Sequence, residues 1–75
     1  MDQGLLWKLR RVAAGLRQQD VAVQVGVSTT RYSAFERGEA APSDTDAELI
    51  EKVLPPLPIA LRVIERKREA IAAAM

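Results

Sequence analysis

Three glycines divide the first half of this chain into short segments of nearly equal length. Gly15, Gly26 and Gly38 lie eleven and twelve residues apart, and the segments between them contain neither glycine nor proline. Glycine readily adopts the left-handed conformation that ends a helix, so each spacing predicts one short helix that stops at a glycine. No segment shows the sustained apolar–polar alternation of a half-buried strand. The sequence therefore predicts an all-α fold.

Serine and proline residues set the other expected helix ends. Ser28 and Ser43 are suited to cap helix starts, because a serine side chain accepts a hydrogen bond from the first turn. Pro55 and Pro56 cannot continue a helix, whereas Pro58 can open one. The five expected helices are residues 5–14, 18–25, 28–37, 44–54 and 58–74. We therefore expect a domain at residues 1–54, then a Pro-Pro hinge and a C-terminal helix for packing or dimerisation at residues 55–75.

Two residue types that carry much of enzyme chemistry are missing, because the 75 residues include no cysteine and no histidine. Disulfides, zinc sites built from these ligands, and cysteine or histidine catalysis are thereby excluded. A chain of this length also has a thin core, without room for a large active-site cavity. No stretch approaches the ~18 apolar residues of a membrane span, and Asp2 stands where a signal peptide needs lysine. We expect a cytoplasmic protein that is not an enzyme, with no cofactor, no metal and no membrane contact.

The charges are segregated along the chain although their sum is only +1. Residues 1–38 carry six basic and three acidic side chains, a net charge of +3. Residues 39–54 carry one basic and five acidic side chains, and residues 55–75 carry four basic and two acidic ones. A folded chain with this pattern has a basic side that is a candidate for phosphate contact. The alternative is an ordinary solvated surface with chance blocks of charge.

The expected third helix has two different faces. Its apolar residues, Tyr32 and Phe35, fall on one side together with the preceding Val27, and their spacing is typical of core residues rather than of base-stacking platforms. The other side is small and polar, and consists of Thr29, Thr30, Ser33 and Ala34. A helix selected only for solubility would carry lysine and glutamate there. This small face lets the helix approach another surface closely and still offer hydrogen bonds, although the threonines could also serve only as helix caps.

A chain of motifs at fixed spacing resembles the helix-turn-helix of the phage repressor/Cro (XRE) family. The matching segments are Arg11–Gln18, Val21-Ala22, Val25–Ser28, Phe35–Glu39 and Pro42-Ser43. The resemblance covers about residues 4–54 and implies a five-helix, lambda-repressor-like DNA-binding domain. Ala22 must be small where the second and third helices cross, and Gly26 supplies the turn between them.

The resemblance also implies roles for individual residues. The third helix would enter the major groove, with Thr29 and Thr30 facing bases and Ser33 and Ala34 one turn further on. Gln18 would bind a phosphate and brace the start of the third helix, Arg37 would bind a phosphate, and Arg31 would reach either a phosphate or a guanine edge. Arg11 and Glu36 match the positions of a structural ion pair between the first and third helices. The expected DNA-contacting residues are Arg17, Gln18, Ser28, Thr29, Thr30, Arg31, Ser33, Ala34 and Arg37.

Two residues depart from the family pattern. Arg17 stands where the family usually has a serine or threonine cap, so we expect the second helix to lose a cap and gain a cation near the DNA. Asp44 stands where the family has an apolar residue, so the fourth helix is expected to start differently or to pack less fully.

The first helix is expected to be apolar on two sides. By the resemblance, Trp7, Arg11 and Ala14 face the helix-turn-helix. A second stripe, formed by Leu5, Leu9, Val12 and Leu16, lies nearly opposite. A helix with two apolar sides must be covered on both, and the C-terminal helix, from the same chain or from a second copy, is the candidate cover. Arg10 has two open interpretations, a solvated residue or a phosphate contact.

These patterns predict a transcriptional regulator, a repressor that binds double-stranded DNA as a homodimer on a palindromic operator and occludes a promoter. One alternative is an antitoxin whose toxin partner binds the C-terminal helix. Another is a protein-interaction module that kept the fold but does not bind DNA.

Overall fold

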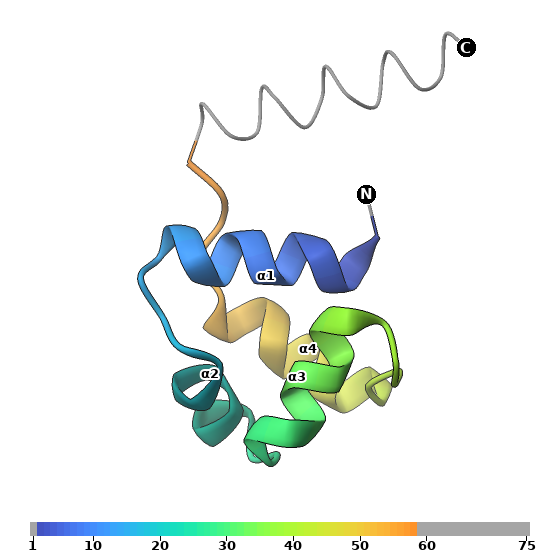
Figure 1. Cartoon of the computed structure of the whole chain (residues 1–75). Coiled ribbons are helices and arrows are strands. Elements are labelled where there is room, and N and C mark those ends of the chain that lie inside the picture. The colour runs from blue at the N-terminus through green and yellow to red at the C-terminus, as the bar shows by residue number, and fades with distance from the viewer. Residues whose placement is uncertain (1, 59–75) are drawn as a thin grey trace, which may run out of the picture.

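The computed structural model describes residues 2–58, and in this part of the chain it contains four helices and no strands. In chain order the helices are α1 (Gln3–Ala13), α2 (Gln18–Val25), α3 (Thr29–Arg37) and α4 (Asp44–Val53) (Figure 1). The predicted all-α fold is confirmed. The C-terminal helix expected from residue 58 to residue 74 lies, apart from its first residue, outside the described part of the chain. None of the described helices combines the length and the apolar content needed to cross a lipid bilayer.

The helix ends follow the glycine and serine signals closely. α2 has the predicted bounds, and both α2 and α3 end at glycines in the left-handed conformation, Gly26 with φ 86° and Gly38 with φ 74°. α1 starts at Gln3 rather than at residue 5, because the Asp2 carboxylate accepts a hydrogen bond of 2.9 Å from the Leu5 amide. A carboxylate at this position is a good helix cap. This cap was not expected from the sequence.

The core lies between the four helices and receives side chains from all of them. Trp7, Tyr32 and Phe35 are at most 2% exposed, which confirms their predicted burial. The other buried members of this cluster are Val21, Ala22, Val25, Ile50 and Leu54. Each large side chain that is fully buried contributes about 1.5–3 kcal/mol of transfer free energy. Ala14, which the resemblance placed toward the helix-turn-helix, instead follows the last turn of α1 and is exposed.

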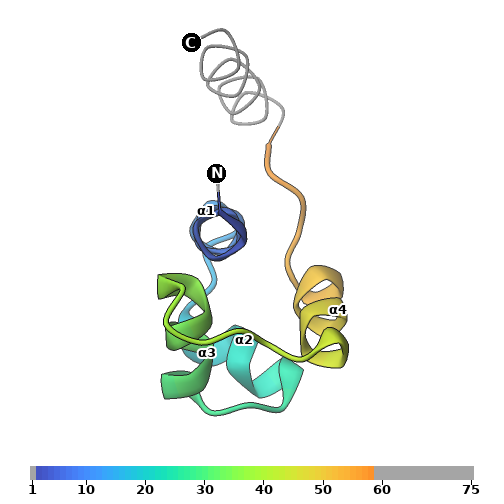
Figure 2. The same cartoon turned by 90° about the vertical axis from the view of Figure 1, so that its right-hand side faces the viewer.

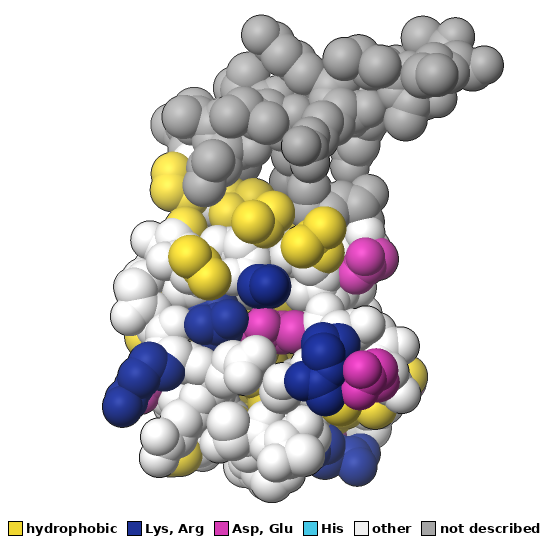
Figure 3. Space-filling view, in the orientation of Figure 1, with side chains coloured by type: hydrophobic (Ala, Val, Ile, Leu, Met, Phe, Trp, Pro, Cys, Tyr) yellow, Lys and Arg dark blue, Asp and Glu magenta, His cyan; other side chains and the backbone are white. Residues whose placement is uncertain are grey.

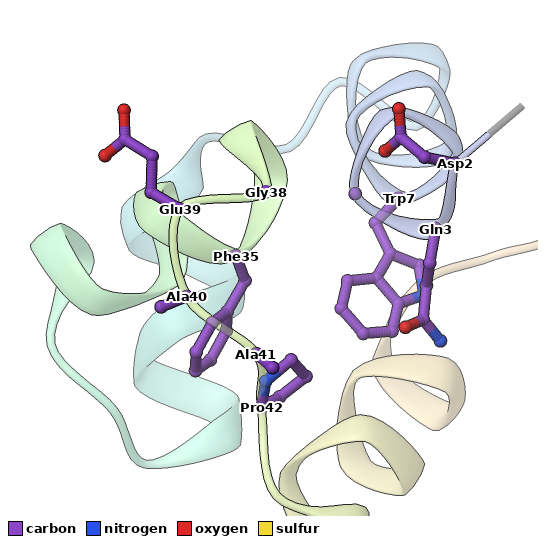
Figure 4. Close-up of a pocket in the computed structure, with 10 residues that line it drawn as sticks. Asp2, Gln3, Trp7, Phe35, Gly38, Glu39, Ala40, Ala41 and Pro42 are labelled. Carbon is purple, nitrogen blue, oxygen red and sulfur yellow. The ribbon is translucent and has the colours of Figure 1, made fainter.

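α1 lies across the remaining helices (Figures 1 and 2). Its backbone comes close to that of α3 at Gly4. A Cβ atom at this position would lie 2.5 Å from the Phe35 carbonyl oxygen and 2.6 Å from that of Glu36. Both oxygens belong to the backbone of α3, so they cannot move aside as a flexible side chain would. Beside this contact, Trp7 and Phe35 point toward Pro42 in the loop that leads to α4 (Figure 4). The absence of a side chain at position 4 thus sets the distance between α1 and α3.

α1 is also tied to the end of α4 by hydrogen bonds. The Trp7 indole N–H donates to one carboxylate oxygen of Glu51 at 2.7 Å, and the Arg10 guanidinium donates to the other at 2.6 Å. Arg10 also donates to the carbonyl oxygens of Glu51, Leu54 and Pro55, at 3.2, 2.6 and 3.0 Å. The last carbonyl groups of a helix have no hydrogen-bond donors within the helix, and here the Arg10 guanidinium provides those donors. Arg10 is therefore a structural residue, and this contact settles the two interpretations left open by the sequence.

The chain remains packed beyond the end of α4. The Pro55 carbonyl is held by Arg10, and Leu57 is only 5% exposed. The first part of the expected hinge, which begins at residue 55, is therefore attached to the helical domain through Leu57.

We predict that Gly4→Ala destabilises the domain by about 1–3 kcal/mol, because the added methyl group overlaps backbone atoms of α3. Glycine-to-alanine changes inside a helix ordinarily stabilise it by up to about 1 kcal/mol, so the predicted effect has the opposite sign. Urea unfolding followed by circular dichroism measures the difference. Gln3→Ala, at an exposed neighbouring position, is the control and should change stability by less than about 0.5 kcal/mol. A Gly4→Ala variant as stable as the original protein would contradict the proposed close contact.

Candidate nucleic-acid interface

The first turn of α3 is presented at the surface. The Ser28 hydroxyl accepts a hydrogen bond of 3.1 Å from the Arg31 amide, which caps the helix. Thr29 and Thr30 follow in the first turn, and both are exposed. Their side chains are therefore available for hydrogen bonds outside the protein, whereas the Ser28 hydroxyl oxygen already accepts one hydrogen bond within it.

Five of the residues expected to contact DNA line one hollow of about 260 Å³. They are Gln18, Thr29, Thr30, Ser33 and Arg37. The hollow joins the N-terminal end of α2 to the small, polar face of α3. It combines hydroxyl groups, an amide and a guanidinium, which are groups that hydrogen-bond base edges and phosphate oxygens.

The other expected residues lie differently. Arg31 is exposed on α3, and its guanidinium carbon lies 5.3 Å from the centroid of the Phe35 ring. Ala34 is half-buried on the same helix and does not line this hollow. Arg17 precedes α2 and is engaged by Asp20. The hydroxyl and amide groups of the candidate site are thus gathered, while two of its three arginines, Arg17 and Arg31, lie outside the hollow.

A buried ion pair holds α3 against α1. Arg11 of α1 donates to both carboxylate oxygens of Glu36, with distances of 2.7 and 3.1 Å. The side chains of the two residues are only 12% and 2% exposed. Arg11 also donates to the Leu16 carbonyl at 2.9 Å, so the guanidinium fixes the turn between α1 and α2 as well. The resemblance pairs these two residues, and they are in contact in the structure.

Gln18 adds α2 to this arrangement. Its side-chain amide donates to Glu36 at 3.2 Å, so it contacts the last turn of α3. The expectation that Gln18 braces the start of α3 differs from this geometry, because its hydrogen bond goes to the opposite end of the helix. Glu36 thus receives hydrogen bonds from α1 and from α2.

Burial alone would raise the pKa of Glu36. Hydrogen bonds from Arg11 and Gln18, together with the nearby Tyr32 hydroxyl, outweigh this effect and hold the pKa below its ordinary value. Burial also raises the pKa of Tyr32, and the adjacent carboxylate raises it further. Among the described residues, the Tyr32 hydroxyl has no hydrogen-bond partner of good geometry, and it remains a neutral phenol at physiological pH. The carboxylate, in contrast, is ionised and paired.

A second hollow of about 370 Å³ extends the site toward α1. It shares Gln18, Ser33 and Arg37 with the first hollow. Its other lining residues are Lys8, an exposed residue of α1, together with Leu5 and the acidic Asp2 and Glu36. Lys8 was not among the expected DNA-contacting residues. Lys8 precedes Arg11 by three residues, so both lie on one side of a helix. This spacing was the sequence signal that could have placed Lys8 at the candidate interface. In the described part of the chain, Lys8 forms no ion pair.

Acidic side chains accompany the basic ones on this surface (Figure 3). Arg17 donates to Asp20 at 2.9 and 3.2 Å, and Arg37 donates to Glu39 at 3.0 Å and to the Ser33 hydroxyl. Asp20 also accepts a hydrogen bond of 2.8 Å from the Arg17 amide. As expected, the Arg17 side chain makes no cap hydrogen bond to α2, and the Asp20 carboxylate instead accepts from the Arg17 backbone amide.

Asp44 does not disturb α4. The helix begins at Asp44, and the Ser43 hydroxyl caps it by accepting a hydrogen bond of 3.1 Å from the Asp46 amide. Carboxylates in the first turn also interact favourably with the helix dipole. The unusual residue is therefore compatible with an ordinary helix start.

A third hollow, of about 320 Å³, lies between the start of α1 and the loop after α3 (Figure 4). Its charged lining residues are Asp2 and Glu39, both acidic. It offers nothing that favours a phosphate. The basic, hydroxyl-bearing surface on α2 and α3 is the better candidate for contact with nucleic acid.

Comparison with protein families agrees with this geometry, since the model of the helix-turn-helix family matches residues 8–61. The chain belongs to the XRE-type helix-turn-helix family. This helix-turn-helix protein is accordingly a DNA-binding transcriptional regulator. Searches of curated proteins and of solved structures give no significant match. The match includes α2, α3 and the turn between them, which carry the first hollow.

We predict that Arg11 and Glu36 of this helix-turn-helix protein are energetically coupled. Glu36→Gln leaves a buried guanidinium without its counter-charge and should lower the free energy of unfolding by about 3–5 kcal/mol. Arg11→Met combined with Glu36→Leu should be more stable than the sum of the single changes predicts, by about 1–3 kcal/mol. Denaturant unfolding of the four proteins gives the coupling energy. Purely additive effects would show that the ion pair does not stabilise this fold.

The ion pair also predicts a loss of stability in acid. Because the pKa of Glu36 is lower in the folded state, its contribution is present above about pH 4.5, the unfolded value, and is lost as the pH falls through the folded pKa. Unfolding free energies measured between pH 6 and pH 3 should therefore decrease more steeply for the original protein than for Arg11→Met/Glu36→Leu. Equal slopes would assign the acid sensitivity to other carboxylates.

Proposed function

We propose that this regulator is a repressor that binds a palindromic operator as a homodimer, with the start of α3 in the major groove. The proposal rests mainly on one observation, the hollow in which the hydroxyls of α3 lie beside Gln18 and Arg37. Phosphate contacts position a protein on DNA, and contacts to base edges specify the sequence. A surface that combines both kinds of group on two adjoining helices fits this division of roles. Occlusion of a promoter is the simplest mechanism for a bound domain of this kind.

Thr29, Thr30 and Ser33 are the proposed base-reading residues, and Ala34 is the proposed apolar contact. A hydroxyl can donate to or accept from a base edge, and a threonine methyl can contact the methyl group of thymine. Ser28 is proposed mainly to hold the first turn of α3 in place, because its hydroxyl already accepts from the Arg31 amide.

The proposed phosphate contacts come from three elements. Gln18 lies at the start of α2, Arg37 at the end of α3, and Lys8 on α1. All three line the second hollow. Arg17 and Arg31 are exposed cations next to this surface and are proposed as further phosphate contacts.

We predict that Arg37→Ala weakens binding to all DNA sequences by a similar factor. It should reduce the slope of log affinity against log salt concentration by about 0.9, because one phosphate contact is lost. Lys52→Ala is the matched control, because Lys52 is an exposed cation on α4 that lines none of these hollows. It should leave the salt slope unchanged. The measurement is fluorescence anisotropy with a random-sequence duplex at several salt concentrations.

A second experiment separates base reading from phosphate contact. After selection of bound sites from random DNA, Thr30→Ala should change the preferred base at one position, with a discrimination of about 1–3 kcal/mol lost there. Affinity for random DNA should change little. If the original protein binds no DNA even at low salt, the protein-interaction module becomes the better explanation of the fold.

The homodimer is proposed from an apolar surface of α1. Val12 is 58% and Leu5 39% exposed in the described part of the chain. Leu16, which was expected to belong to this stripe, instead packs against the core. Residues 59–75 carry further apolar side chains, including Ile64, and lie outside the described part of the chain. We propose that this segment and α1 together form the dimer interface.

We predict that Val12→Glu shifts the protein from dimer toward monomer, because a charge would be buried at the interface. Val23→Glu is the matched control, since Val23 is also an exposed valine within a helix, at 72% exposure on α2. Light scattering at a protein concentration of ~100 µM measures the mass. A monomeric original protein, near 8.2 kDa, would contradict the dimer directly.

A further inference from the structure

The two arginines at the ends of the candidate interface are both already paired with acidic residues. Arg17, which precedes α2, contacts Asp20 at 2.9 Å, and Arg37, at the end of α3, contacts Glu39 at 3.0 Å. The hydrogen bond from Arg17 lowers the pKa of Asp20, and that from Arg37 lowers the pKa of Glu39. Both carboxylates are therefore ionised at neutral pH. They present to each guanidinium the same kind of oxygen that a DNA phosphate would present.

These pairs are accessible and weak enough to exchange. The Arg17 side chain is 75% exposed and that of Arg37 is 51% exposed, so a phosphate can reach both. Exposed ion pairs contribute little net free energy, in contrast to the buried pair of Arg11 and Glu36. A carboxylate and a phosphate can each accept two hydrogen bonds from one guanidinium, so the two compete for the same donors.

We propose that Asp20 and Glu39 act as internal competitors of the DNA phosphates and so reduce the affinity of the protein for DNA of any sequence. This inference rests on the proposed DNA-binding function. Non-specific binding consists almost entirely of phosphate contacts, so it is the mode of binding that these carboxylates weaken most directly. A regulator with fewer strong phosphate contacts spends less time on the many sites that are not its operator.

A simpler explanation must be separated from this one. Any negative charge near DNA repels it, whether or not the charge is paired with an arginine. Competition requires the arginine, whereas repulsion does not. Removing the arginine first therefore distinguishes the two explanations.

The experiment measures affinity for a random-sequence duplex at several salt concentrations. We expect Asp20→Asn and Glu39→Gln each to raise affinity by about two- to fivefold and to steepen the salt slope by up to about 0.9. Asparagine keeps an oxygen that can accept from the Arg17 amide, so this hydrogen bond at the start of α2 is retained. Glu48→Gln, which removes an exposed acid of α4, is the matched control and should have a smaller effect.

The decisive comparison places each change in a protein that lacks the paired arginine. Asp20→Asn should have no larger effect than Glu48→Gln when it is combined with Arg17→Gln, and the same holds for Glu39→Gln combined with Arg37→Gln. An equal gain in affinity with and without the arginine would overturn the competition, as would unchanged affinity in the single variants. If either of these two results is found while the original protein still binds the duplex with a clear salt dependence, only the competition is wrong and the proposed DNA-binding function stands. If no variant binds DNA at any salt concentration, the proposed function itself is wrong.

Discussion

The orientation of the candidate recognition helix depends on the Glu36 carboxylate. This buried group lies at the point where α1, α2 and α3 meet, and each oxygen accepts hydrogen bonds that a neutral side chain could not all replace. Removing two charges from water is costly, and only close pairing with further hydrogen bonds offsets that cost. The hydrogen bonds to Glu36 therefore favour one relative placement of the three helices. This is the placement in which Arg11 and Gln18 both reach the carboxylate.

Packing at Gly4 makes this geometry possible. The ion pair requires α1 to lie close to α3, and the backbone contact at Gly4 permits that approach. The candidate interface therefore combines a fixed buried ion pair with exposed ion pairs that can exchange. The buried Arg11–Glu36 pair fixes the frame, while the exposed pairs of Arg17 and Arg37 can exchange partners without disturbing it.

The sequence was a good guide to local structure. Helix ends depend on hydrogen bonds and dihedral preferences within a few residues. Glycines end α2 and α3, at Gly26 and Gly38, and serines cap the starts of α3 and α4, at Ser28 and Ser43. The family pattern supplied the pairing of Arg11 with Glu36, which lies 25 residues away and which no local rule would give. Helical spacing alone predicted which residues form the small, polar face of α3.

Other features depend on packing between distant segments, and the sequence alone does not predict them. The partners of Arg10 lie 41 to 45 residues away, so its contacts appear only when α1 and α4 are placed together. Gly4 looked like an unremarkable residue near the chain start, because its importance lies in the α3 backbone opposite. The pairing of Arg17 with Asp20 is local, in contrast, and its three-residue spacing on a helix start was a signal that could have been used.

The contacts of Arg10 have a consequence for the order in which the domain opens. They join α1, near one end of the described chain, to Leu54 and Pro55, near the other. We expect contacts between segments so distant in sequence to form after the local turn between α2 and α3. Fraying of α1 removes the partner of the last carbonyls of α4, and release of those carbonyls frees α1. We therefore expect the amide hydrogens of α1 and of the last turn of α4 to exchange together.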